Sequence, residues 1–142
     1  MDTFTAIRER RSVKHFDPAH EMTDKEITTL LEAAALSPTA FNAQHWRFVI
    51  VEDKNLRNEL QQAAFGQPQV SEASLLIVLC ADKQAWNKKP QRYWENAPKE
   101  VQNYLIPAMK NYYSDNDRVQ QDECMRSCGI AAQTLMLAAK AM

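Results

Sequence analysis

Glycine is almost absent from this chain, with only Gly66 and Gly129 among 142 residues. Phosphate-binding loops of the dinucleotide and P-loop kinds need several glycines at fixed offsets, because the backbone must approach the phosphate closely. The scarcity of glycine therefore excludes both kinds of loop. Any phosphate bound by this chain must therefore be held by side chains and helix ends.

Cysteine and long apolar runs are also scarce. Of the three cysteines, Cys124 and Cys128 are spaced i, i+4 on an expected helix, unlike the Cys-x-x-Cys pair of redox motifs. We expect both to be small buried hydrophobic residues. No run approaches the roughly 18 apolar residues that span a bilayer, and residues 1–4 show no signal-peptide pattern. These observations predict a cytoplasmic protein without membrane contacts.

Charge is nearly balanced overall, with a net charge of −1, but residues 8–14 contain four cations and one anion. One local cluster does not indicate nucleic-acid binding. Guanidinium groups with a hydroxyl at the end of a short helix can grip a phosphate. The alternative is a solvated helix end whose cations favour the helix dipole. The candidate phosphate-binding residues are Arg10, Arg11, Ser12 and Lys14.

Helix and strand signals alternate along the chain. The sequence predicts helices at about 3–10, 24–36, 54–64, from 98 and from 117 onward, with strands at 46–51 and 75–80. Thr23 and Glu26 form a capping box that begins the second helix. These signals predict one domain over residues 1–142, of α/β or α+β class, with helices packed on a small sheet.

Two predicted elements are strongly apolar. The run from Leu75 to Cys80 is typical of a strand covered on both faces. The last helix is apolar nearly all round from Gly129, which predicts a central buried helix. Residues 85–96 show no clear period and are interpreted as a mobile insertion.

An uncharged polar loop at residues 37–46 carries a second set of candidates. Asn42 and Gln44 offer donors and acceptors that can read the edge of a planar heterocycle, with Pro38 and Thr39 against the ring face. The alternative is an ordinary helix-to-strand connector. Gln67 and Gln69, before the apolar strand, are a weaker pair: Gln69 can donate to a carbonyl oxygen, or the segment is a plain connector.

No arrangement of side chains suggests catalysis by the protein alone. His15, His20 and His45 lack metal-ligand spacing, and no Ser/His/Asp or Cys/His pattern is present. An enzyme with this sequence would therefore depend on a cofactor for its chemistry.

Three stretches together resemble the FMN-dependent nitroreductase family: Arg10 to Asp17, Ser37 to Phe48, and Gln67 to Val70. They occur in the family's order and spacing, and residues 125–127 and 131–142 are similar to the family's long central helix. The likeness is greatest to the branch that reduces quinones and nitroaromatics. The resemblance implies a nitroreductase-type α+β fold with a three-layer, α/β/α-like arrangement. It also implies an intertwined homodimer with FMN at each end of the subunit interface.

The resemblance also implies roles for particular residues. Arg10, Ser12 and Lys14 would hold the phosphate and ribityl chain of FMN, with Arg11 assisting. The flavin ring would be bordered by Pro38, Thr39, Ala40 and Asn42 from the other subunit, and by Gln67 and Gln69 near its pyrimidine edge. NAD(P)H would reduce FMN at N5, and a small aromatic acceptor would reoxidise it, without a catalytic side chain or a metal.

The chain ends at Met142, where the family continues with a glycine-rich turn, further strands, a basic residue on the phosphate and a C-terminal arm. We therefore expect residues 1–142 to lack part of the sheet, of the FMN site and of the dimer clasp. Two alternatives stay open. One is a non-catalytic fragment that binds no flavin, and the other is a helical interaction module whose basic patch binds an acidic partner.

Overall fold

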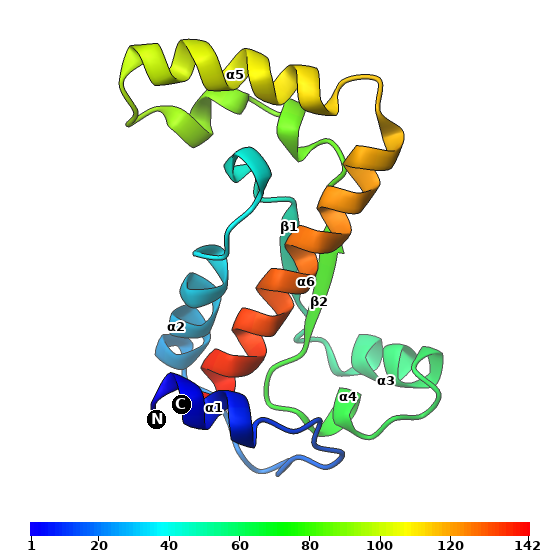
Figure 1. The fold of residues 1–142 in the computed structure, drawn as a ribbon. Helices are drawn as coiled ribbons and strands as arrows, with labels where there is room; N and C mark the ends of the chain where they lie inside the picture. Colours follow the sequence, from blue (N-terminus) through cyan, green and yellow to red (C-terminus); the bar gives the residue numbers. More distant parts are fainter.

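The computed structural model describes residues 1–142 and combines helices with a small antiparallel sheet (Figure 1). In chain order the elements are α1 (Thr3–Glu9), α2 (Asp24–Ala35), η1 (Ala40–Asn42), β1 (Trp46–Ile50), α3 (Lys54–Ala63), α4 (Gln69–Glu72), β2 (Ile77–Ala81), η2 (Ala85–Asn87), η3 (Pro90–Trp94), α5 (Lys99–Tyr113) and α6 (Asp117–Ala141), where η marks a short 3₁₀ helix. The predicted α+β class is confirmed.

Local caps set where three helices begin. The Asp2 carboxylate accepts hydrogen bonds from the Phe4 and Thr5 N–H groups before α1. Thr23 and Glu26 form both halves of the predicted capping box before α2. Asp53 accepts from the Leu56 N–H before α3. Each cap pairs a backbone donor that the helix leaves unsatisfied and stabilises the helix start by about 1 kcal/mol.

The sheet consists of β1 and β2, paired antiparallel with Phe48 opposite Leu79. Trp46, Phe48 and Leu79 pack against Cys128 and Ala131 of α6, so α6 covers one face of the sheet. The other face is open, with Val49 47% and Val78 37% exposed. The expectation of a strand covered on both faces is therefore wrong for these residues.

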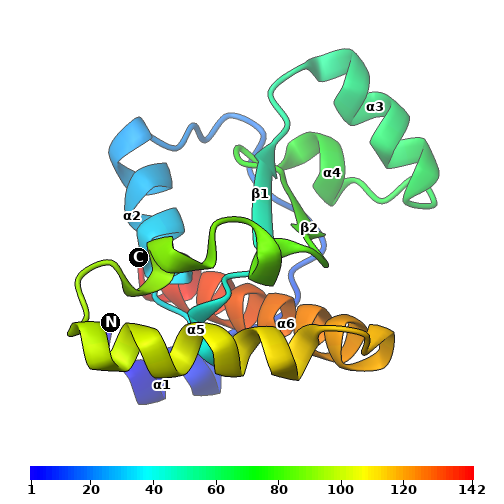
Figure 2. The same cartoon turned by 90° about the horizontal axis from the view of Figure 1, so that it is seen from above.

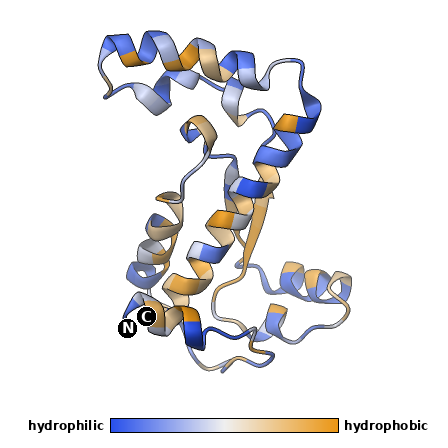
Figure 3. Ribbon diagram, in the orientation of Figure 1, coloured by the Kyte–Doolittle hydropathy of each residue, from blue (hydrophilic) through white to orange (hydrophobic).

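Helix α6 runs the length of the molecule and contacts α1, α2, α5 and both strands (Figure 1). Its buried residues lie in the first half and at the centre: Gln120, Glu123, Cys124, Ser127, Cys128 and Ala131. The apolar second half, which Figure 3 colours mostly orange, is only partly covered, and Met136 is 44% exposed. The prediction of a buried central helix therefore holds for Ala131, which packs against the sheet, and is wrong for the exposed side of this half.

The two ends of the chain lie side by side. The N-terminal ammonium of Met1 donates to the Ala141 carbonyl at 3.2 Å, and Glu9 lies 3.4 Å from Lys140. None of the helices has an apolar stretch long enough to span a bilayer.

At the other end of the molecule, α5, η2 and η3 form a layer across the start of α6 (Figure 2). Residues 85–96, expected to be mobile, are packed here: Trp86 is 6% exposed and stacks on Tyr113 with 5.7 Å between the ring centroids. Burial of one aromatic ring anchors a segment that has no helical or strand period.

Candidate functional site

The basic segment follows α1 directly. Arg10 is half-buried, whereas Arg11, Ser12 and Lys14 are exposed. The Arg11 guanidinium donates to the Arg8 and Arg10 carbonyls at 2.7 and 2.8 Å and thereby satisfies the end of α1. The side chains of Arg10, Ser12 and Lys14 make no hydrogen bond or ion pair within the chain. Three donors of the kind that bind phosphate are therefore free for a ligand.

The segment after Lys14 reaches α4, where the second predicted glutamine pair lies. The Phe16 N–H donates to the Glu72 carboxylate at 3.2 Å, which ties the two segments together. Gln69 Nε2 donates to Gln67 Oε1 at 3.4 Å, but Gln69 Oε1 is buried without any partner. A buried oxygen without a hydrogen bond reduces the stability of the fold by about 1–3 kcal/mol. Gln69 Oε1 could therefore accept a hydrogen bond from a donor outside the chain.

The polar loop lies at the other end of α2, away from the basic segment (Figure 1). Pro38, Thr39 and Ala40 share a cavity of about 310 Å³ with Ser127 of α6. Lys140 of the same helix meets Glu9 of α1. Thirteen residues of helix separate Ser127 from Lys140, which corresponds to about 20 Å. Within one chain, the structure does not bring the two predicted sets together.

The backbone of the polar loop is strained. Phe41, Asn42 and Gln44 all have positive φ, at 53°, 53° and 48°. The Gln44 N–H donates to Thr39 Oγ1 at 3.1 Å, and Gln44 Nε2 donates to Asn42 Oδ1 at 3.2 Å. Left-handed conformations of residues other than glycine cost about 1 kcal/mol or more each and persist where the surroundings enforce them, frequently at functional sites.

A buried histidine and a buried tyrosine pack beneath this loop and are hydrogen-bonded to each other. His45 is fully buried, with Nδ1 3.1 Å from the Asp82 carbonyl and Nε2 3.2 Å from the Tyr113 hydroxyl. Burial lowers the pKa of His45, which keeps the ring neutral. Nδ1–H then donates to Asp82, and Nε2 accepts from Tyr113. The same hydroxyl lies 3.4 Å from the Ala40 carbonyl in η1.

A charged pair lies beside the cavity of Pro38, Thr39 and Ala40. Glu123 is 5% exposed and accepts hydrogen bonds from Arg126 and, at 2.9 Å, from the Tyr112 hydroxyl. The hydrogen bond to this carboxylate raises the pKa of Tyr112. Glu123 and Arg126 were not predicted as site residues, although their i, i+3 spacing on one helix is a signal for an ion pair.

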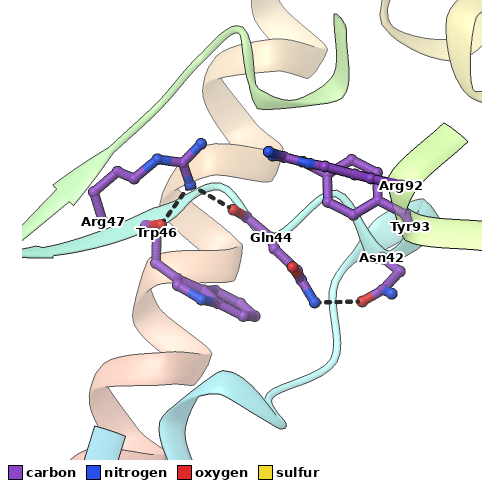
Figure 4. A pocket seen from close by; sticks show the side chains of 6 residues that line it. All are labelled: Asn42, Gln44, Trp46, Arg47, Arg92 and Tyr93. Atoms are coloured by element: carbon purple, nitrogen blue, oxygen red, sulfur yellow. Dashed lines mark hydrogen bonds between the residues drawn. The ribbon is translucent and has the colours of Figure 1, made fainter. Parts of the chain in front are cut away.

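A second cavity, of about 450 Å³, opens between η1, β1 and η3 (Figure 4). Its lining residues are Asn42, Gln44, Trp46, Arg47, Arg92 and Tyr93. Of these, Asn42 and Gln44 were both expected to read the edge of a planar ligand, and Asn42 was also expected at the flavin border. Arg47 lies in the stretch from Ser37 to Phe48 but was given no role, and Arg92, 45 residues further along the chain, belongs to none of the three stretches. Nowhere in the structure do three His, Cys, Asp or Glu side chains converge in a way that suits a metal ion.

The sequence profile of the Nitroreductase family matches residues 7–142. The chain belongs to the nitroreductase family. It is 54% identical over 142 residues to Protein DrgA of Synechocystis sp., covering 100% of this chain and 68% of that protein. It is 31% identical over 148 residues to MhqN of Bacillus subtilis, which carries the name NAD(P)H nitroreductase, covering 99% and 71% of the two chains.

A solved nitroreductase structure has the same fold as this chain. The protein from Exiguobacterium sibiricum, crystallised in complex with FMN, superimposes with a TM-score of 0.90 at 28% sequence identity. The match covers 99% of this chain and 70% of that one. The nitroreductase resemblance of the sequence and its fold class are thus confirmed.

Proposed function

We propose that this nitroreductase is an FMN-dependent oxidoreductase that takes electrons from NAD(P)H and passes them to nitroaromatic or quinone acceptors. The observation that carries the proposal is the family match over residues 7–142, a range that includes the basic segment and both polar loops. The FMN complex of the Exiguobacterium sibiricum protein and the name of MhqN support the choice of cofactor and reductant.

The residues present fit FMN. A phosphate needs cationic and hydroxyl donors, and Arg10, Ser12 and Lys14 have such donors with no partner inside the chain. A flavin ring carries an imide N–H, which is a donor of the kind that buried Gln69 Oε1 lacks. Gln67, hydrogen-bonded to Gln69, would hold that side chain in place.

When bound, FMN would supply two-electron hydride chemistry at its N5 atom. Arg10 and Lys14 would neutralise its phosphate, and Ser12 would donate a hydrogen bond to the phosphate or the ribityl chain. Arg11 would assist by closing the end of α1, as its bonds to the Arg8 and Arg10 carbonyls indicate. The protein would contribute position and electrostatics, and no side chain is required as an acid or base.

We propose that the loop residues Pro38, Thr39, Ala40 and Asn42 complete the site from a second copy of the chain. The distance of about 20 Å along α6 separates them from the basic segment of their own chain. A homodimer would bring the two sets together. The apolar half of α6, with Met136 44% exposed, offers surface for such pairing.

Titration of the purified chain with FMN, followed by flavin fluorescence, tests the proposal. We expect saturable quenching, weakened about tenfold or more by Arg10→Ala, because a hydrogen bond to a charged group contributes about 1.5–3 kcal/mol. Arg118→Ala removes an exposed arginine of α6 paired with Asp122 and is the matched control, expected to leave binding unchanged.

A chain that quenches no flavin fluorescence would exclude FMN binding by residues 1–142 and favour the non-catalytic fragment. Partner binding that weakens with salt, in the absence of flavin, would favour the interaction module. If FMN binds, NADH and NADPH oxidation with a quinone and with a nitroaromatic then tests the donor and the acceptor.

A further inference from the structure

The cavity between η1, β1 and η3, which we call the arginine cleft, contains two guanidinium groups and no carboxylate. Arg47 comes from β1 and Arg92 from η3, and none of the other four lining residues is acidic. Figure 4 shows the two guanidinium ends extending toward each other across the opening of the cleft. Like charges arranged in this way repel unless an anion lies between them.

The acid nearest to the arginine cleft cannot balance its charge. Asp82 Oδ2 accepts from Arg47 at 2.8 Å and also from Lys88 at 2.8 Å, so one carboxylate serves two cations. Burial opposes ionisation of Asp82, but the hydrogen bonds from Lys88 and from the Gln84 N–H hold its pKa below the usual range. Arg92 forms no ion pair at all. Two cations therefore share the Asp82 carboxylate, and Arg92 has no acidic partner.

Arg92 is held in place without an acidic partner. Its guanidinium carbon lies 4.6 Å from the centroid of the Tyr93 ring, and its NH2 group donates to the Tyr93 hydroxyl at 2.6 Å. That hydroxyl in turn donates to the Ala85 carbonyl at 3.2 Å. Stacking on an aromatic ring fixes the plane of the guanidinium and leaves its other N–H donors free.

The rest of the arginine cleft suits a flat ligand. The half-buried Tyr93 supplies aromatic surface, and Trp46, whose side chain packs against α6, borders the cleft. Asn42 and Gln44 bond to each other at 3.2 Å and keep further amide donors and acceptors available. Arg47 is committed to the Gln44 and Trp46 carbonyls and to Asp82, which makes Arg92 the freer of the two cations.

We propose that the arginine cleft binds the anionic group, carboxylate or phosphate, of an aromatic or nucleotide ligand, with Arg92 as the specificity-determining residue. The proposal rests on the proposed function and deepens it, since Asn42 belongs both to the cleft and to the loop assigned to the flavin border. The anion has two possible sources with the same chemistry: a carboxylate on the aromatic acceptor, or a ribose phosphate on the nicotinamide donor.

Titration of the flavin-free chain by NMR, following the indole N–H signal of Trp46, tests the proposal directly. The probes are 4-nitrobenzoate against nitrobenzene for the acceptor, and 2′-AMP against adenosine for the donor. We expect at least one anionic probe to bind, and Arg92→Gln to weaken it about tenfold, the effect of losing one charge-assisted hydrogen bond. The neutral probes should be unaffected.

Arg92→Lys keeps the positive charge but loses the planar pair of N–H donors of the guanidinium. It should therefore recover part of the affinity that Arg92→Gln loses. Arg118→Gln, an exposed arginine outside the cleft, is the matched control and should bind like the wild type. The thermal midpoint of each variant reports on folding, which an exposed arginine should not disturb. The anionic probe that depends on Arg92 identifies the source of the anion.

The proposal is overturned if neither anionic probe shifts the Trp46 signal, or if binding is equal in the wild type and Arg92→Gln. Because the chain is free of flavin in this titration, the result is independent of FMN binding. Arg92-dependent binding in a chain that fails the FMN titration would leave the anion site standing and remove the proposed function. Normal FMN binding without anion binding would overturn the anion site and leave the proposed function standing.

Discussion

The buried hydrogen bond between Tyr113 and His45 provides a sharp test of how the polar loop is held. Tyr113 is fully buried, and its hydroxyl lies 3.2 Å from His45 Nε2. The substitution Tyr113→Phe removes that oxygen and nothing else. The ring keeps its stacking on Trp86 and its edge contacts with Phe41, so no cavity forms.

The expected cost follows from what is left behind. In Tyr113→Phe, the Nε2 atom of a fully buried His45 loses its donor. An unsatisfied buried polar group costs about 1–3 kcal/mol. For a chain of this length we therefore expect the thermal midpoint to fall by roughly 3–9 °C.

Urea denaturation monitored by circular dichroism measures the loss in unfolding free energy, and thermal denaturation followed by the same signal measures the fall in the thermal midpoint. Tyr104→Phe is the matched control, because Tyr104 is 74% exposed and its hydroxyl makes no hydrogen bond; its effect should stay within about 0.5 kcal/mol. Equal stability of Tyr113→Phe and the wild type would refute the reasoning, since the hydroxyl would then not be satisfying His45 in the folded protein.

Three further predictions concern other parts of the chain. Burial lowers the pKa of His45 below its ordinary 6.5, so the unfolded chain binds more protons as the pH falls. The free energy of unfolding should therefore decline as pH falls below about 7, and His45→Gln should flatten that slope in urea titrations. Thr23→Ala removes the capping box and should cost about 1 kcal/mol by the same assay, whereas Thr3→Ala, which caps nothing, should cost less. In the FMN-loaded protein, Gln69→Lys should raise the flavin midpoint potential because a cation favours the electron-rich reduced state; spectroelectrochemistry giving an unchanged potential would contradict this.

Features decided by near neighbours in sequence could be predicted. The capping box of Thr23 and Glu26 and the cap at Asp53 act over three residues, so the starts of α2 and α3 follow from local chemistry. The two strands follow from their β-branched and aromatic content, with ends displaced by up to two residues. The family also followed from short motifs in the right order, since motif spacing is a property of the chain alone.

The burial of α6 could not be predicted from its composition. The composition of its apolar half predicts that this half is buried, but the fully buried side chains include Cys124 and Ser127 of the polar half. What decides burial is which elements pack against each half, and the aromatic layer of α5 and η2 covers the first. The likewise buried His45 satisfies its ring nitrogens through Asp82 and Tyr113, partners 37 and 68 residues away.

Some features of the candidate site can likewise be predicted from sequence, and others depend on the tertiary structure. The donors that suit a phosphate, Arg10, Ser12 and Lys14, are evident from the amino-acid sequence because their chemistry is carried by residue type and close spacing. The separation of these donors from the polar loop, and the meeting of Arg47 with Arg92 in one cleft, depend on how the chain folds back on itself. Long-range packing alone decides which distant side chains face each other, and residue type does not encode it.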